Sequence, residues 1–189
     1  MSKTRFITLT AVFCALGVLL PQAFHVFGES AGKVFLPMHI PAMLAGIIVS
    51  PLSGFVCGLI SPILSFVVTG GAMPILIKVP FMMLEIGAYG LFCGLFSQKV
   101  FSKNRIADII VNVISVFAAQ IAGRVVNAAG VLAAVYVFGV THKGVSLGAV
   151  LAALTAGVPG IIIQLFLVPA LAVLLKKAVS ADFFRHKVK

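Results

Sequence analysis

Five polar side chains stand inside strongly apolar stretches of this sequence, at spacings that place them on two helical faces. Glu85 and Tyr89 are four residues apart, and Gln120, Arg124 and Asn127 are separated by four and three residues. Residues three or four apart share one face of an α-helix. Ionisable and amide groups are costly inside hydrocarbon, so they are candidates for function. Together these groups suit the binding of a small polar molecule.

The depths of these side chains follow from the rise of a helix. A span that enters from outside near residue 80 places Glu85 ~8 Å and Tyr89 ~14 Å below its outer end. A span that enters from inside near residue 106 carries Gln120 to ~21 Å and Arg124 to ~27 Å along its length. In ~30 Å of hydrocarbon both stripes lie in the outer half. With Gln22 at a similar level on the first span, the sequence predicts a polar pocket that opens outward.

Two interpretations of the central charges stay open. Glu85 and Arg124 could neutralise each other as a structural pair, or they could pair and also contact a ligand. Tyr89 alone is a weaker candidate, since tyrosine is common near membrane interfaces. Counted along a continuous last span, Gln164 lies ~27 Å from the outer end. We therefore expect it to bond another helix, outside the site.

A histidine stands between two prolines in the first outer loop. His39 follows Pro37 and precedes Pro41, so the backbone around it is restrained. It could donate to a ligand or simply begin a helix. A lone histidine does not make a metal site, and the three cysteines form no C-x-x-C pair. We expect neither a metal nor a cofactor.

The elements that carry these residues are membrane spans. Of the 189 residues, 61% are hydrophobic and 10% are charged, whereas a soluble domain carries roughly 25% charged residues. Apolar stretches long enough to cross the lipid bilayer recur throughout the chain. The sequence predicts an all-α integral membrane protein, a compact bundle of six transmembrane helices in one domain, 1–189. The expected spans are 5–24, 39–50, 52–68, 80–96, 106–138 and 146–175.

Three of these spans are unusual. The fifth is too long for one untilted crossing, so it must tilt, kink near Gly130 or protrude. The sixth contains Pro159. The second is short, and the sequence Ser50-Pro51 predicts a tight turn after it.

The distribution of cations predicts orientation. The side that holds both termini carries ten cations, and the other side carries three. Because cytoplasmic loops are enriched in Lys and Arg, both termini are expected in the cytoplasm of a multi-pass cell-membrane protein. The net charge of +10 does not indicate nucleic acid, because the cations cluster at span ends rather than on a soluble basic face. The ten are Lys3, Arg5, Lys99, Lys103, Arg105, Lys176, Lys177, Arg185, Lys187 and Lys189.

Small residues form two further motifs. Ala11-x-x-x-Ala15 lies on the first span and Gly54-x-x-x-Gly58 on the third. Small residues at this spacing let helices approach closely. Each motif could serve internal packing or could form a docking surface for another membrane protein.

The order of these motifs resembles the substrate-binding S components of energy-coupling factor (ECF) vitamin transporters. The resemblance covers nearly the whole chain, with about 190 residues and six expected spans. It rests on Ala11-x-x-x-Ala15, Leu36-Pro37-Met38-His39-Ile40-Pro41 followed by Leu44-Ala45-Gly46, Leu84-Glu85-x-x-x-Tyr89-Gly90, and Gly123-Arg124-x-Val126.

The resemblance implies a binding protein rather than an enzyme. Such a subunit binds a vitamin or vitamin precursor from outside, docks on a transmembrane coupling protein and works with two cytoplasmic ATPases. Ala11 and Ala15 match the docking motif. The residues that match pocket-lining positions are Glu85, Gln120, Arg124 and Asn127. Pantothenate and a hydroxymethylpyrimidine-like heterocycle are both candidate substrates. The chain has no Gly-rich loop ending in Gly-Lys-Ser/Thr, consistent with separate ATPases.

A second class of function stays open. The chain could be a stand-alone secondary transporter or channel for a small polar solute, with Glu85 as a proton relay. Uptake by this chain alone into liposomes under a proton gradient would discriminate the two classes. An intramembrane enzyme is disfavoured, because no His-Glu-x-x-His motif or recognisable Ser/His arrangement is present.

Overall fold

The computed structural model describes residues 3–25, 34–71, 76–99, 105–140, 142 and 145–185. Five of the described helices are long and apolar enough to cross a membrane. The expected all-α membrane fold is therefore confirmed. The elements are α1 (Lys3–His25), α3 (His39–Ile48), α4 (Pro51–Val68), the 3-10 helix η1 (Leu76–Lys78), α5 (Val79–Lys99), α6 (Arg105–Tyr136), α7 (Leu147–Ala156) and α8 (Val158–Arg185).

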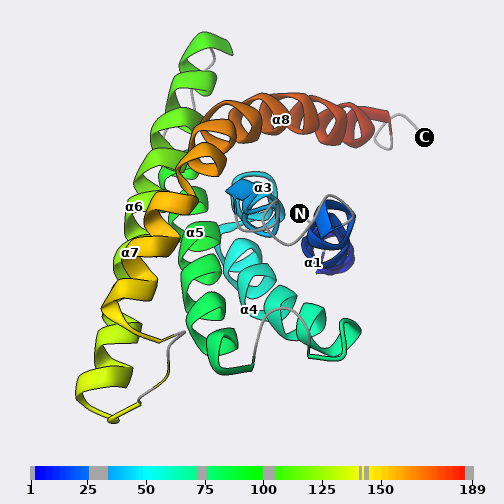
Figure 1. The fold of residues 1–189 in the computed structure, drawn as a ribbon. Coiled ribbons are helices and arrows are strands. Elements are labelled where there is room, and N and C mark those ends of the chain that lie inside the picture. Colours follow the sequence, from blue (N-terminus) through cyan, green and yellow to red (C-terminus); the bar gives the residue numbers. More distant parts are fainter. Residues whose placement is uncertain are drawn as a thin grey trace.

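The short helix α3 lies at the centre of the bundle. It packs against α1, α4, α5 and α8, and Figure 1 shows it in the middle of the molecule, below α8. Ala42, Met43 and Ala45 have no exposed surface. Ten residues give a length of ~15 Å, about half of the hydrocarbon thickness. The expected second span is thus a buried helix of half length, shielded from lipid by its neighbours.

A tight turn joins α3 to α4, as the sequence predicts. Ser50 caps α4 by accepting a hydrogen bond from the Ser53 backbone N–H at 3.0 Å. Pro51 occupies the first position of the helix, where a backbone N–H would have no partner within the helix, so its absence costs nothing. This turn makes α4 an immediate neighbour of α3.

Glycines bring α3, α4 and α5 into close contact. A Cβ on Gly54 would lie 2.6 Å from the Gly90 carbonyl oxygen and 2.8 Å from the Gly46 Cα. A Cβ on Gly58 would meet the backbone of α5. The Gly54-x-x-x-Gly58 motif therefore serves internal packing. Close approach of this kind fixes the position of α5, which carries the central carboxylate.

The expected sixth span, 146–175, is wrong as one continuous helix. The chain breaks at Gly157 into α7 and α8, and Figure 1 shows α7 beside α6 and α8 passing over α3. Pro159 is the second residue of α8, so its missing N–H disrupts no helical bond. The sequence Gly157-Val158-Pro159 thus begins a new helix instead of kinking an old one.

The fifth span is one unbroken helix. α6 has 32 residues and passes through Gly130 without interruption. Its length of ~48 Å exceeds the hydrocarbon thickness, so tilt or protrusion accommodates it.

Candidate functional site

The predicted polar stripes of α5 and α6 meet at Glu85. Arg124 places Nη1 3.2 Å from Glu85 Oε1. The Tyr89 hydroxyl donates to Glu85 Oε1 at 3.0 Å, and the Asn127 amide Nδ2 donates to Glu85 Oε2 at 2.7 Å. These four side chains form one connected cluster between two helices that pack side by side. We call it the Glu85 network.

The Glu85 network is well shielded. The exposed fractions of the Arg124 and Glu85 side chains are 15% and 9%. A buried charge is costly unless it is paired and hydrogen-bonded, and here the carboxylate receives three donors. The pairing predicted from the sequence is therefore present. Contact with a ligand stays a prediction.

His39 lies against this network. Its ring meets the Tyr89 ring edge to face, with centroids 4.8 Å apart. The His39 Nδ1 lies 3.1 Å from the Leu36 carbonyl oxygen. Because a carbonyl only accepts, the neutral ring carries its hydrogen on Nδ1, and Nε2 is left as an acceptor.

Leu36 organises the segment before α3. Its φ is +50°, a left-handed conformation that is rare for a leucine. Its carbonyl oxygen accepts from the His39 backbone N–H and from Gln164 Nε2, both at 3.1 Å, in addition to His39 Nδ1. Several hydrogen bonds to one carbonyl hold this strained residue in place.

Gln120 points away from Glu85, toward a second cluster. Its Nε2 donates to Gln164 Oε1 at 3.2 Å and lies 3.3 Å from the Ile161 carbonyl oxygen. The expectation that Gln164 bonds another helix is confirmed. The depth estimated for Gln164 was wrong, because the break at Gly157 starts α8 beside Arg124 and brings Gln164 level with Gln120. The Gly-Val-Pro-Gly sequence at 157–160 was the signal for this break.

Several buried polar atoms near the two clusters have no hydrogen-bond partner among the described residues. They include Arg124 Nε and Nη2, His39 Nε2 and Gln120 Oε1. Gln22 Nε2 is also unpartnered, but α1 packs on α3 and α4, and no described contact brings Gln22 to the Glu85 network. Buried polar groups are usually satisfied, so unpartnered atoms in one region mark a site for a ligand or water.

The two small-residue motifs differ in exposure. Ala11 and Ala15 lie on the exposed side of α1, whereas Phe13 and Cys14 between them are buried. Gly54 and Gly58 face the interior, against the backbone of α5. The exposed face of α1 is therefore free to receive a neighbouring helix, as far as the described residues show.

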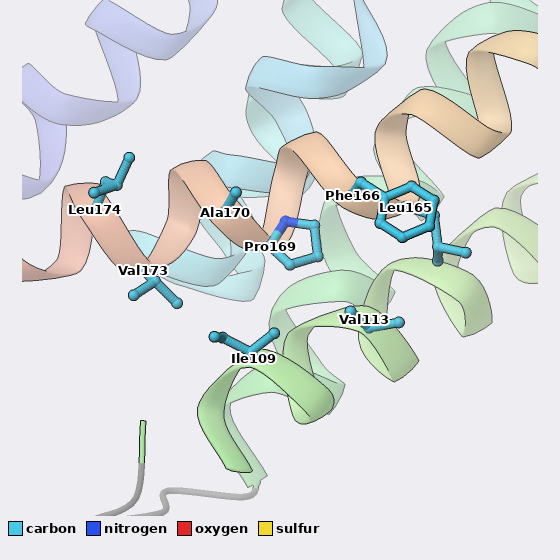
Figure 2. A pocket seen from close by; sticks show the side chains of 8 residues that line it. All are labelled: Ile109, Val113, Leu165, Phe166, Pro169, Ala170, Val173 and Leu174. Atoms are coloured by element: carbon cyan, nitrogen blue, oxygen red, sulfur yellow. The ribbon is translucent and has the colours of Figure 1, made fainter. Parts of the chain in front are cut away.

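An open apolar groove of about 460 Å³ lies elsewhere, between the first half of α6 and α8. Figure 2 shows side chains from both helices around it, all of them apolar. No polar side chain among its described lining residues could orient a small polar ligand, and lipid chains match its chemistry. The lining residues are Ile109, Val113, Leu165, Phe166, Pro169, Ala170, Val173 and Leu174.

Comparison with known proteins agrees with the all-α membrane fold. Residues 5–172 match the family described as ECF transporter, substrate-specific component. No curated protein and no solved structure matches the chain. The match covers most of the sequence, including every residue of the two polar clusters. The chain therefore belongs to the substrate-specific components of ECF transporters, multi-pass membrane subunits of substrate importers.

Proposed function

We propose that this chain is the high-affinity substrate-binding subunit of an ATP-driven ECF importer for a vitamin or vitamin precursor. The observation that carries the proposal is the Glu85 network, a buried polar cluster with unsatisfied donors inside a bundle of apolar helices. The ion pair with Glu85 uses only Nη1 of Arg124 and gives no role to its Nε and Nη2 donors. A ligand that accepts from them explains why a costly charge is kept there.

The binding site in this proposal combines the network with its neighbours. Glu85 orients Arg124, while Tyr89 and Asn127 fix the carboxylate. His39 forms the side of the proposed site that lies next to Leu36. The residues assigned to the substrate are Glu85, Tyr89, Gln120, Arg124, Asn127 and His39.

The proposed partners are those of the family: a transmembrane coupling protein and two cytoplasmic ATPases. The exposed face of α1 supports docking through Ala11 and Ala15. A methyl group at each position allows a partner helix to approach closely. Placement of both termini in the cytoplasm puts this motif in the cytoplasmic half of the membrane, on the side of the ATPases. Protease cleavage of terminal tags in sealed vesicles tests that orientation.

Two measurements test the function. Native mass spectrometry of the purified chain should identify a bound small molecule. Vesicles that hold the chain with a coupling protein and ATPases should accumulate that molecule only with ATP inside. Uptake by the chain alone, driven by a proton gradient, would instead establish the stand-alone transporter and remove the ATP-dependent assignment.

A further inference from the structure

We infer that the substrate is uncharged where it meets the Glu85 network, and that it offers an acceptor to Arg124 and a donor to His39. The inference rests on the proposed function and specifies the chemistry of the same site. A primary carboxamide, or a heterocycle edge with the same pattern, fits this description. A carboxylate does not.

The first step is the unused edge of Arg124. In a guanidinium, Nε–H and one Nη2–H point in parallel on the same side, and Nη1 lies on the other side. Arg124 uses Nη1 for Glu85, while its Nε and Nη2 have no partner within the described part of the chain. The open edge is thus a two-donor fork, which binds an oxygen with two lone pairs or two neighbouring acceptors.

The second step is the acceptor on His39. The hydrogen bond from Nδ1 to Leu36 leaves Nε2 with a lone pair and no hydrogen. This nitrogen is buried and unpartnered among the described residues. A substrate group that reaches this nitrogen must donate a hydrogen bond to it, and a carboxylate has no donor to offer.

The third step is proximity. A Cβ built on Gly157 would lie 2.9 Å from Arg124 Nη2 and 3.1 Å from Leu36 Cδ1, so the open fork and Leu36 flank the same point. His39 is bonded to the carbonyl of that same Leu36. The inference therefore places the substrate beside Leu36, where the Arg124 fork and the His39 ring are both close by.

The fourth step is charge. Glu85 already neutralises Arg124, and no second cation joins the Glu85 network among the described residues. A bound carboxylate would add a negative charge that no described cation compensates, and an uncompensated charge is costly in a buried site. A carboxamide adds none, because its oxygen accepts from the Arg124 fork while its NH₂ donates to His39 Nε2.

The test uses matched pairs in which only the carboxylate is replaced by its primary amide. The probes are nicotinate and nicotinamide, biotin and biotinamide, and pantothenate and pantothenamide. Binding to the purified full chain is measured by titration of the melting temperature. We expect the amide of whichever pair binds to be preferred by at least tenfold, or ~1.4 kcal/mol. Equal affinity, or preference for the carboxylate, overturns the inference and leaves the importer function intact.

If no pair binds, the charge of the molecule that co-purifies with the chain tests the inference instead. A neutral molecule supports the inference. An anion overturns it if replacing its anionic group by a neutral amide weakens binding, and supports it if binding is kept or strengthened. Failure to detect any bound small molecule removes the proposed function as well.

Two variants locate the site independently of the substrate's identity. Gly157→Ala adds a methyl against the Arg124 fork and should weaken binding of the preferred amide, or of the co-purifying molecule, at least tenfold. Gly148→Ala, on α7, is the matched control, because its new Cβ would lie 3.9 Å from Ser146 Oγ and meets nothing closer. Wild-type affinity in Gly157→Ala, with melting temperature unchanged, would place the substrate elsewhere.

Discussion

The replacement Gly54→Ala tests the close packing that holds the site together. In the present structure the new Cβ would lie 2.6 Å from the Gly90 carbonyl oxygen and 2.8 Å from the Gly46 Cα. Both obstacles are backbone atoms, so no side chain can rotate away. Reaching an ordinary contact of 3.4 Å requires α4 to retreat by about 0.8 Å from α5.

The size of the effect follows from this displacement. Overpacking of a tight core costs about 1–3 kcal/mol. For a chain of 150–250 residues, each kcal/mol shifts the melting temperature by about 2–4 °C. We therefore expect Gly54→Ala to melt about 2–12 °C lower than wild type. Substrate affinity should also fall, because Gly90 follows Tyr89 on α5 and moves with the Glu85 network.

The assay is thermal unfolding of the purified chain in detergent, with Gly148→Ala as the control. An alanine in an open helical position is intrinsically favoured over glycine by up to about 1 kcal/mol. The control should thus melt at or above the wild-type temperature. A Gly54→Ala protein that is as stable as the control would refute the close approach of α3, α4 and α5.

Three further predictions concern individual contacts. Arg124→Ala removes charged hydrogen bonds worth about 1.5–3 kcal/mol each, so equilibrium binding of the co-purified substrate should weaken more than tenfold; unchanged affinity would exclude Arg124 as a contact. Ala11→Leu with Ala15→Leu should preserve substrate affinity but abolish ATP-driven uptake and pull-down of the coupling protein, and normal uptake would rule out this face of α1. Gln164→Leu removes the buried hydrogen bond from Gln120 Nε2 and one of the three hydrogen bonds to the Leu36 carbonyl, so chemical or thermal unfolding should show a loss of about 1–3 kcal/mol. A neutral result for Gln164→Leu would mean that water replaces these bonds.

Several features of the protein follow from local sequence. Long apolar stretches determine a helical membrane protein, because a helix satisfies its own backbone hydrogen bonds in lipid. The spacing of Gln120, Arg124 and Asn127 places them on one stripe, and two members of the stripe do reach Glu85. Helical periodicity links sequence to side-chain direction, so these predictions needed no knowledge of distant contacts.

Other features depended on how the helices pack. The motif at Ala11 and the motif at Gly54 have the same spacing, yet one is exposed and the other is buried against α5. The same limit applies to Gln164, whose neighbours are set by a helix break at Gly157 and by a loop more than 120 residues earlier. Periodicity fixes which side chains share a face, but which faces meet is decided by steric fit between helices from distant parts of the chain. Only the tertiary structure therefore shows that the Arg124 fork and His39 Nε2 have no hydrogen-bond partner among the described residues.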